Sequence, residues 1–147
     1  MTRDETIKVL ATLKAAYPSA YKGMTKDEAN GTIATWAAQF AGTPALVVHM
    51  AIQKLIGTNV FPPSISEVKS KLRGMYWEAW MKIKEHEQCP DLYGELDPKE
   101  LQAYRIVLQA CERYHRDASA QELSLGELLD NYAAFLPAGS DDQNLLE

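Results

Sequence analysis

One signal for the start of a helix recurs along this chain and constrains its fold more than any other feature. Ser or Thr is followed three residues later by Glu at Thr2–Glu5, Thr25–Glu28 and Ser64–Glu67. In such a capping box the hydroxyl accepts a hydrogen bond from an early helical N–H, and the carboxylate accepts one from the N–H of the capping residue. Further starts are predicted at Thr43–Pro44, at Asp97–Pro98, and at Ser124–Glu127 with Ser119–Glu122 as its competitor. The chain is therefore expected to consist of consecutive helices.

Apolar residues recur every three to four positions after these signals. The stripes include Ile7, Leu10 and Leu13, then Trp36 and Phe40, then Val47 and Ala51, then Val68 and Leu72, and later Leu101, Leu108 and Leu128. This spacing is typical of helices with one buried face, and no alternating strand pattern occurs. Gly74 lies among strong helix formers, so we expect one long helix over residues 65–86. The predicted fold is all-α: a small helical bundle with Trp36 at its centre, a long fourth helix and an additional C-terminal helical segment.

Charge divides the chain into a mildly basic front and an acidic back. Eleven Lys and Arg and eight Asp and Glu precede Cys89, whereas four basic and twelve acidic residues follow from there, within a total of −5. The asymmetry fits two different partners or one half shielding the other, although solvated helix faces explain any single charge. We divide the chain into a helical domain over residues 1–87, a linker over 88–96, an acidic helical extension over 97–136 and a flexible tail over 137–147.

Composition also indicates where the chain works. Its two cysteines, Cys89 and Cys111, are too few for a disulfide framework and favour a reducing compartment. The charged and polar first residues do not resemble a signal peptide, and no apolar run approaches the roughly 20 residues of a membrane helix. We therefore expect a cytoplasmic protein with no membrane partner.

No catalytic motif is present. The eight glycines are scattered singly, so neither a nucleophile elbow nor a phosphate-binding loop occurs, and we expect no enzyme activity and no cofactor. Two sulfurs and two imidazoles form a weak candidate for a zinc site at His86, Cys89, Cys111 and His115. The second pair is one helical turn apart, as in zinc sites on helices, but the first lacks the usual Cys-x-x-Cys turn. Cys111 also fits the buried stripe, so core packing is the favoured interpretation.

Basic and aromatic residues are interleaved along the predicted fourth helix. The candidates for partner binding there are Lys69, Lys71, Arg73, Trp77, Lys82 and Lys84. Such cations can hold phosphates while aromatic rings stack on bases, which makes nucleic acid one candidate partner. In the alternative interpretation the tryptophans belong to the core and the lysines only solvate the outer face. Direct contact with DNA is not favoured, because the isoelectric point is near 5.2 and the acidic half repels a polyanion.

Several sequence blocks of the front half carry a resemblance. Leu13-Lys-Ala-Ala-Tyr17-Pro18 is followed by Trp36, and then by Phe61-Pro62-Pro63-Ser64-Ile65-Ser66-Glu67-Val68. As a set, over roughly residues 1–87, these blocks resemble the phage replicative-helicase loader and inhibitor family. Whatever the family, we expect the paired prolines to stiffen the loop, Phe61 to staple it to the bundle, and Ser64 with Glu67 to cap the next helix.

The resemblance implies a function that composition does not. Such loaders bind the hexameric replicative helicase in the bacterial host cell, hold it inactive and bring it to DNA marked by an origin-binding initiator. In the family, a flexible C-terminal region engages the helicase, but here the sequence no longer matches after about Glu87. The tail contains an acidic and apolar motif that either docks in a groove of a partner or has no role: Asp141, Asp142, Leu145 and Leu146.

The leading hypothesis is therefore a non-enzymatic phage or prophage DNA-replication protein. It is expected to bind, restrain and help load a hexameric replicative helicase, with an initiator as a further partner. A DNA-binding replication initiator or regulator is the first alternative. A phage structural protein or assembly chaperone is the second, because helical composition alone permits it.

Overall fold

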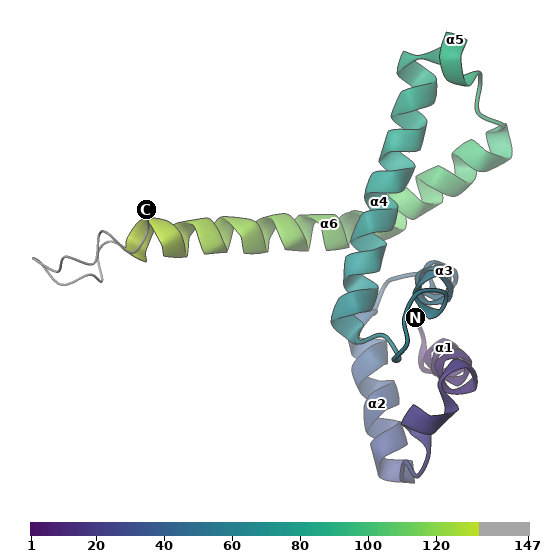
Figure 1. Ribbon diagram of the computed structural model, residues 1–147, viewed down its shortest axis with the longest axis vertical. Helices are drawn as coiled ribbons and strands as arrows, with labels where there is room; N and C mark the ends of the chain where they lie inside the picture. The colour runs from purple at the N-terminus through teal and green to yellow at the C-terminus, as the bar shows by residue number, and fades with distance from the viewer. Residues whose placement is uncertain (133–147) are drawn as a thin grey trace, which may run out of the picture. The chain divides into compact units, whose positions relative to one another are not determined.

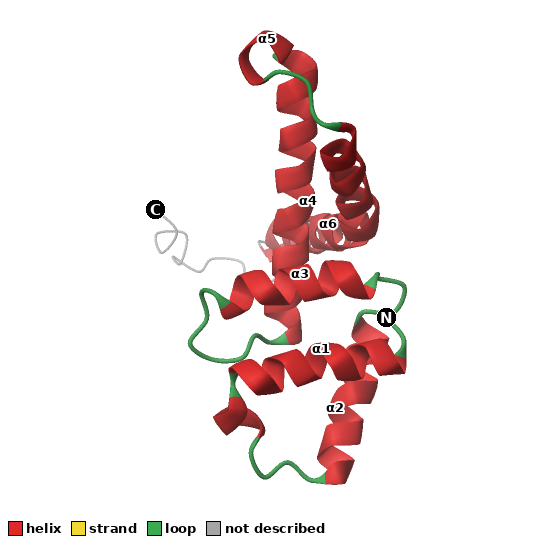
Figure 2. Ribbon diagram, turned by 90° about the vertical axis from the view of Figure 1, so that its right-hand side faces the viewer, coloured by secondary structure: helices red, strands yellow, loops and turns green. Residues whose placement is uncertain are grey.

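The computed structural model describes the backbone of residues 1–132 and the side chains of residues 1–116. It divides the chain into two compact units, Met1–His115 and Arg116–Glu147. Within the described residues every regular element is a helix, which confirms the predicted all-α fold (Figures 1 and 2). In chain order the elements are α1 (Arg3–Ala16), the short 3-10 helix η1 (Pro18–Tyr21), α2 (Lys26–Gln39), α3 (Ala45–Ile56), α4 (Ile65–Gln88), α5 (Pro90–Tyr93) and α6 (Pro98–Tyr132). No helix among these residues is long and apolar enough to cross a membrane.

The three capping boxes form as predicted. The backbone N–H groups of the glutamates donate to the capping hydroxyls at 3.1 to 3.2 Å. Each glutamate carboxylate in turn accepts a hydrogen bond from the N–H of its capping residue. Helices α1, α2 and α4 therefore begin where the sequence places them. Helix α4 continues through Gly74 to Gln88, which confirms the long fourth helix.

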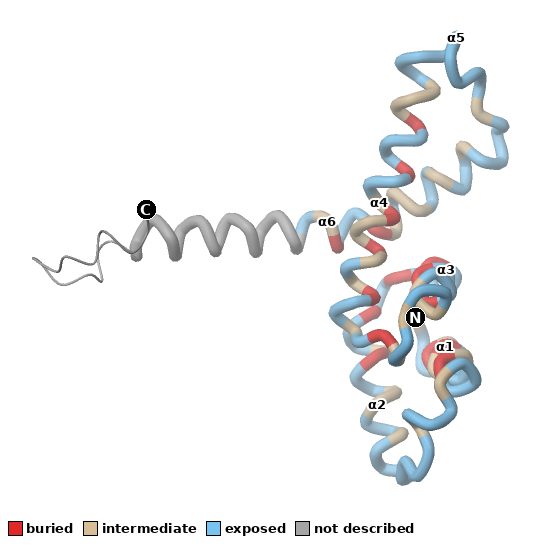
Figure 3. Tube along the Cα trace, in the orientation of Figure 1, coloured by how far each residue is buried: buried red, intermediate tan, exposed pale blue. Residues whose placement is uncertain are grey.

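One apolar core holds the first unit together. Its fully buried side chains include Leu13 from α1, Phe40 at the end of α2, Ile52 from α3 and Leu72 from α4. Trp36 is only 8% exposed, and its ring centroid lies 5.6 Å from that of Phe40, which confirms its predicted place in the core. Figure 3 shows the buried positions on the sides of α1, α3 and α4 that face the interior.

The first part of α6 also belongs to this core. Cys111 and Tyr114 are buried in the same cluster, and the ring of Tyr114 lies 6.4 Å from that of Phe40. The compact unit therefore extends to His115, beyond the boundary that we expected after residue 87. The expected linker 88–96 contains the short helix α5. Charge and proline patterns marked a boundary here, but they do not report that a later helix returns to the core.

The turn at residues 40–44 connects distant parts of the first unit. The amino group of Met1 donates to the carbonyls of Phe40 and Thr43 at 3.1 and 2.8 Å. The hydroxyls of Thr43 and Tyr114 share a buried hydrogen bond. Because its hydroxyl is used there, Thr43 does not cap α3, whose N-cap is Pro44 without a side-chain hydrogen bond. The position of this helix start was predicted to within a residue, but the cap was wrong.

Helix α6 begins at Pro98, as predicted, and runs without a break to Tyr132. The further helix start predicted at Ser124, or at Ser119, is therefore wrong. Ser–x–x–Glu spacing also occurs inside a continuing helix when the flanking residues are good helix formers. Of the second unit the structure describes only this continuation of α6. The predicted tail 137–147, with its motif Asp141, Asp142, Leu145 and Leu146, lies outside the described residues.

Candidate partner-binding surfaces

The residues predicted for partner binding on α4 divide between two flanks of that helix. Lys71 and Lys82 lie on one flank of the buried stripe that contains Leu72 and Ile83. On the other flank, at about 100° per residue, five residues fall within an arc of about 80°. This α4 aromatic face consists of Lys69, Arg73, Trp77, Trp80 and Lys84. The basic residues of α4 therefore do not form a single continuous surface.

Two tryptophans occupy the centre of the α4 aromatic face. Trp77 and Trp80 are 42% and 40% exposed, and their rings meet edge to face with centroids 5.8 Å apart. The ammonium of Lys84 lies 6.0 Å from the Trp80 centroid, at the limit of a cation–π contact. From α6, His115 stacks on Tyr76 at 4.6 Å and meets the ring of Trp77 edge-on at 4.8 Å. The tryptophans are therefore positioned surface residues and not the core residues of the alternative interpretation.

Three lysines on the two flanks have polar or acidic neighbours. Lys69 donates to the side-chain oxygen of Gln39. Lys84 pairs with Glu87 at 3.5 Å and Lys82 with Glu85 at 3.8 Å, each three residues further along the helix. Exposed ion pairs of this kind contribute roughly 0.3–0.5 kcal/mol to stability, so they are easily exchanged for contacts with a partner. Central aromatic rings, with Lys84 paired to a carboxylate and Lys69 to an amide, suit a protein partner.

The loop between α3 and α4 exposes the side chain that we expected it to bury. Phe61 is 79% exposed and the neighbouring Val60 is 84% exposed, so the predicted role of Phe61 as a staple is wrong. Pro63 is buried and Pro62 is partly buried. The prolines therefore fix this loop against the bundle, and the phenylalanine faces solvent. Aromatic character alone predicted the opposite, because it does not report which loop residue turns inward.

Two of the sequence blocks meet at this loop. The hydroxyl of Tyr17, immediately before Pro18 and η1, donates to the carbonyl of Asn59 at 2.9 Å. The side-chain amide of Asn59 donates to the carboxylate of Glu67 at 2.7 Å. Glu67 is also the partner of Ser64 in the capping box that begins α4. The Tyr–Pro and Phe–Pro–Pro–Ser blocks thus form one hydrogen-bonded assembly.

An apolar cavity of about 310 Å³ lies between α1, η1 and α2. Ile7, Leu10, Met24 and Ile33 line it, and Lys14 is the only charged residue among those that do. No sequence pattern singled it out, because its residues come from three elements and each also fits an ordinary half-buried helix face. Its mostly apolar lining offers a surface for apolar contact.

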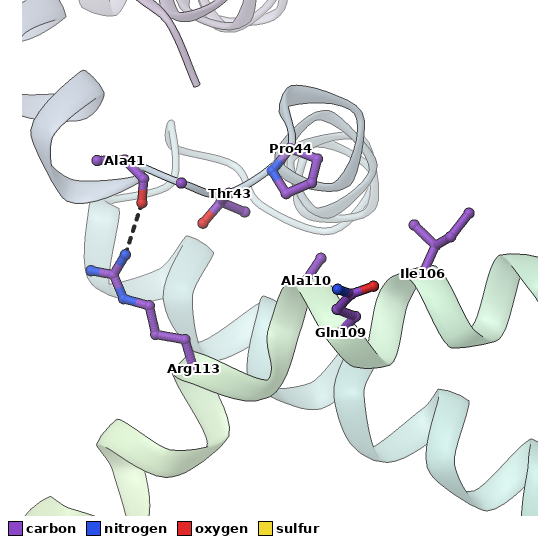
Figure 4. Close-up of a pocket in the computed structure, with 8 residues that line it drawn as sticks. Ala41, Thr43, Pro44, Ile106, Gln109, Ala110 and Arg113 are labelled. Carbon is purple, nitrogen blue, oxygen red and sulfur yellow. Dashed lines mark hydrogen bonds between the residues drawn. The ribbon is translucent and has the colours of Figure 1, made fainter.

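A second cavity, of about 460 Å³, lies between the turn at residues 40–44 and α6 (Figure 4). Arg113 reaches across its edge and donates to the carbonyl of Ala41 at 2.9 Å. Ile106 and Gln109 line the side formed by α6. The polar groups here close the turn against α6, which is a structural role.

The four candidate zinc ligands are not brought together. Nδ1 of His86 lies 2.9 Å from the carbonyl oxygen of Gly94, while His115 stacks on Tyr76. Cys111 is buried in the core and Cys89 is exposed. Burial raises the pKa of the Cys111 thiol to about 11. Among the described residues, no three His, Cys, Asp or Glu side chains are grouped to hold a metal ion, so the zinc candidate has no site there.

These features define a small helical domain that offers apolar contact surfaces. Residues 1–69 of the chain match the family model of the N-terminal domain of the phage helicase loader and inhibitor protein. The match confirms, over that segment, the resemblance seen in the sequence blocks; it ends within α4, before Trp77 and before residue 87. Neither a curated protein nor a solved structure matches the chain. The loop with Val60 and Phe61 lies inside the matched segment, and most of the α4 aromatic face lies beyond it.

Proposed function

We propose that this chain is a non-enzymatic phage or prophage replication protein that binds a hexameric replicative helicase, restrains it and helps to load it. It would act in the cytoplasm of the bacterial host, with an origin-binding initiator as a second partner. The observation that supports this function is the match of residues 1–69, since an N-terminal domain of this family implies a helicase-associated replication protein of phages.

The α4 aromatic face is a suitable surface for such a partner. Its centre is aromatic and half-exposed, and among the cations around that centre Lys84 pairs with Glu87 and Lys69 bonds Gln39 of α2. Residues that dominate protein interfaces are enriched in Trp, Tyr and Arg and are surrounded by polar contacts that exclude water. The contact of His115 with Tyr76 and Trp77 fixes the rings before any partner arrives, which lowers the entropy lost on binding.

The proposed function is tested by mixing the purified chain with the cognate helicase. Size-exclusion chromatography with light scattering measures complex formation, and a coupled assay measures the ATPase activity of the helicase. We expect a stable complex at micromolar concentrations and suppression of the ATPase. If no complex forms at these concentrations, the proposed function is wrong.

A matched pair of variants tests the α4 aromatic face within that complex. Lys84→Glu and Lys82→Glu make the same change of charge on the same helix, and each removes an ion pair with a glutamate three residues away. Only Lys84 belongs to the aromatic face. We expect Lys84→Glu and Trp77→Ala to weaken binding by about 10-fold or more, and Lys82→Glu to leave it nearly unchanged. Equal effects of the two lysine variants would show that net charge matters and the face does not.

A DNA-binding initiator or regulator is the second candidate function. Its support is the adjacent pair Trp77 and Trp80 beside Lys84, because stacking rings next to a cation are characteristic of surfaces that bind single strands. Fluorescence anisotropy with labelled single- and double-stranded oligonucleotides at several salt concentrations discriminates this candidate function from helicase binding. Binding that falls steeply with salt and requires Trp77 would favour this candidate. We expect negligible binding even at low salt.

A further inference from the structure

We propose that two copies of this chain pair antiparallel along α4, so that the α4 aromatic face of each copy is covered by that of the other. The inference does not rest on the proposed function, because it concerns what covers this face in the free protein. The two uses of the face exclude each other, so a paired chain would have to separate before the face could bind a helicase.

The face lies on a part of α4 that the front of the bundle does not cover. In Figures 1 and 2 the second half of α4 extends past α1, α2 and α3 and ends at α5. Three large apolar side chains in this half, Trp77, Trp80 and Met81, are 42%, 40% and 53% exposed. Exposed apolar side chains gathered on one side of a helix are typical of a surface that another molecule covers.

The spacing along this face suits contact with another helix. Five residues follow one another at intervals of four, three, four and three, and we call this row the α4 seam: Arg73, Trp77, Trp80, Lys84 and Glu87. At about 100° per residue, Glu87 falls within the same arc as the α4 aromatic face. Alternating intervals of three and four keep side chains on the contact line between two packed helices. The α4 seam is about 21 Å long, so we expect a small interface and a dissociation constant in the micromolar range.

Charge along the face selects the antiparallel direction. The face begins with Lys69 and Arg73, has the two tryptophans at its centre and ends at Glu87, with Asp91 of α5 just beyond it. A parallel pair would bring like charges together at both ends, which is unfavourable. In an antiparallel pair the basic start of one face lies along the acidic end of the other.

The positions of the charges are also symmetric about one tryptophan. Arg73 lies seven residues before Trp80, and Glu87 lies seven residues after it. A two-fold axis at Trp80 therefore places Arg73 of each copy opposite Glu87 of the other. In such a pair every contact occurs twice, because the same surface is used on both copies.

The remaining two residues of the α4 seam fit the same register. Trp77 lies three residues before Trp80 and Lys84 lies four residues after it, so the axis brings Lys84 of one copy toward Trp77 of the other. Within one copy the Lys84 ammonium lies 6.0 Å from the Trp80 centroid, at the limit of a cation–π contact. The edge-on contact with His115 positions the Trp77 ring before pairing. A second copy thus supplies a further cation to a ring that is already in place.

A nucleic acid strand is a weaker occupant of this face. Glu87 and Asp91 lie at its end and repel phosphates, and Lys84 is paired with Glu87 at 3.5 Å. A second copy supplies opposite charge to both ends of the face and further rings to its centre. We therefore commit to a second copy.

Sedimentation velocity of the full chain over a series of concentrations tests the pairing. We expect the parent to change from monomer to dimer across the micromolar range. Glu87→Lys and Glu85→Lys are a matched pair, since each reverses one charge on α4 and removes an ion pair with the lysine three residues before it. Only Glu87 belongs to the α4 seam. We expect Glu87→Lys to raise the dimer dissociation constant by about 10-fold or more, and Glu85→Lys to leave it nearly unchanged.

A mixing experiment tests the register. Arg73→Glu and Glu87→Lys should each pair poorly with themselves, because like charges then face each other at both ends of the α4 seam. Mixed in equal amounts, the two variants should form a heterodimer with the affinity of the parent, since both ends again join opposite charges. Lys69→Glu changes the same end and takes the place of Arg73→Glu if circular dichroism shows that Arg73→Glu does not fold.

Three outcomes would overturn the inference. The first is a parent chain that stays monomeric at every concentration, and the second is an equal effect of Glu87→Lys and Glu85→Lys. The third is a parent dimer whose two folded variants do not pair when mixed, because another surface or direction must then hold it together. The proposed function is judged separately, since it fails only if the chain does not bind the helicase.

Discussion

The matched segment, residues 1–69, and the region from Tyr76 to His115 are both helical and both expose large apolar side chains, but they differ in how many residues they give to the core. In the first, helices α1, α3 and the beginning of α4 surround Leu13, Ile52 and other apolar side chains completely. In the second, α5 and the first turns of α6 leave several large apolar residues of the region exposed, among them Trp77, Trp80, Met81, Leu92 and Ile106. The same apolar spacing along a helix thus gives a buried core where neighbouring helices cover it, and an exposed contact surface where they do not.

The largest expected effect distinguishes a core tryptophan from a surface one. Trp36→Ala should lower the free energy of unfolding by about 3–5 kcal/mol, because it removes a buried ring next to Phe40. Trp80→Ala removes a ring of equal size from the surface and should cost far less. Urea denaturation followed by circular dichroism measures both. Similar midpoints for the two variants would contradict the contrast between the regions.

A second prediction concerns the bond between the two regions. Tyr114→Phe leaves the hydroxyl of Thr43 buried without its partner, which should cost about 1–3 kcal/mol. Adding Thr43→Val should recover part of that loss, because both polar groups are then absent. A double-mutant cycle on urea midpoints measures the coupling. Strict additivity of the two substitutions would show that this hydrogen bond does not tie α6 to the front of the unit.

A third prediction tests the local signal that begins α4. Ser64→Ala removes the hydroxyl that accepts from Glu67 and should cost about 1 kcal/mol. Ser66→Ala, two residues further on, changes the same atom inside the helix and should be neutral or slightly stabilising. The same denaturation assay compares them. Equal effects would mean that the capping box is incidental to stability.

The smallest effect is a dependence on pH within the first capping box. The hydrogen bond from the backbone N–H of Thr2 holds the pKa of Glu5 below its ordinary value of 4.5. A folded-state pKa below the unfolded one means that this stabilisation is complete at neutral pH and is lost as the pH falls through the folded value. As the pH is lowered from neutral through the folded-state pKa of Glu5, the urea midpoint should therefore fall less for Glu5→Gln than for the parent. A parallel decline would place the acid sensitivity elsewhere.

The parts of the fold that local chemistry determines could be predicted. A Ser or Thr three residues before Glu begins a helix where a loop precedes it, as at the starts of α1, α2 and α4, but the same spacing inside α6 begins none. Trp36 lies on a stripe that several helices cover, and its burial was predicted for that reason. The family resemblance was also recognisable, since its blocks lie together in the first 69 residues.

The parts that depend on distant contacts could not be predicted. Thr43 has the appearance of a cap, but Tyr114 takes its hydroxyl from 71 residues away. Phe61 has the appearance of a core residue, but the burial of Pro63 places it at the surface. The candidate contact surfaces depend on the same distant contacts, because a side chain stays exposed only where no other element packs over it. Composition gives no measure of that.

The hydrogen bond between Thr43 and Tyr114 also has a consequence for the timing of folding during synthesis. The helices up to α4 leave the ribosome before the residues that complete their core, so Phe40 lacks its neighbours Cys111 and Tyr114 until α6 has been made. A chain that stops before this point keeps its helix starts and loses the cover of its core. The domain as measured by sequence similarity is thus shorter than the compact unit, whose core is completed only when the α6 residues have been made.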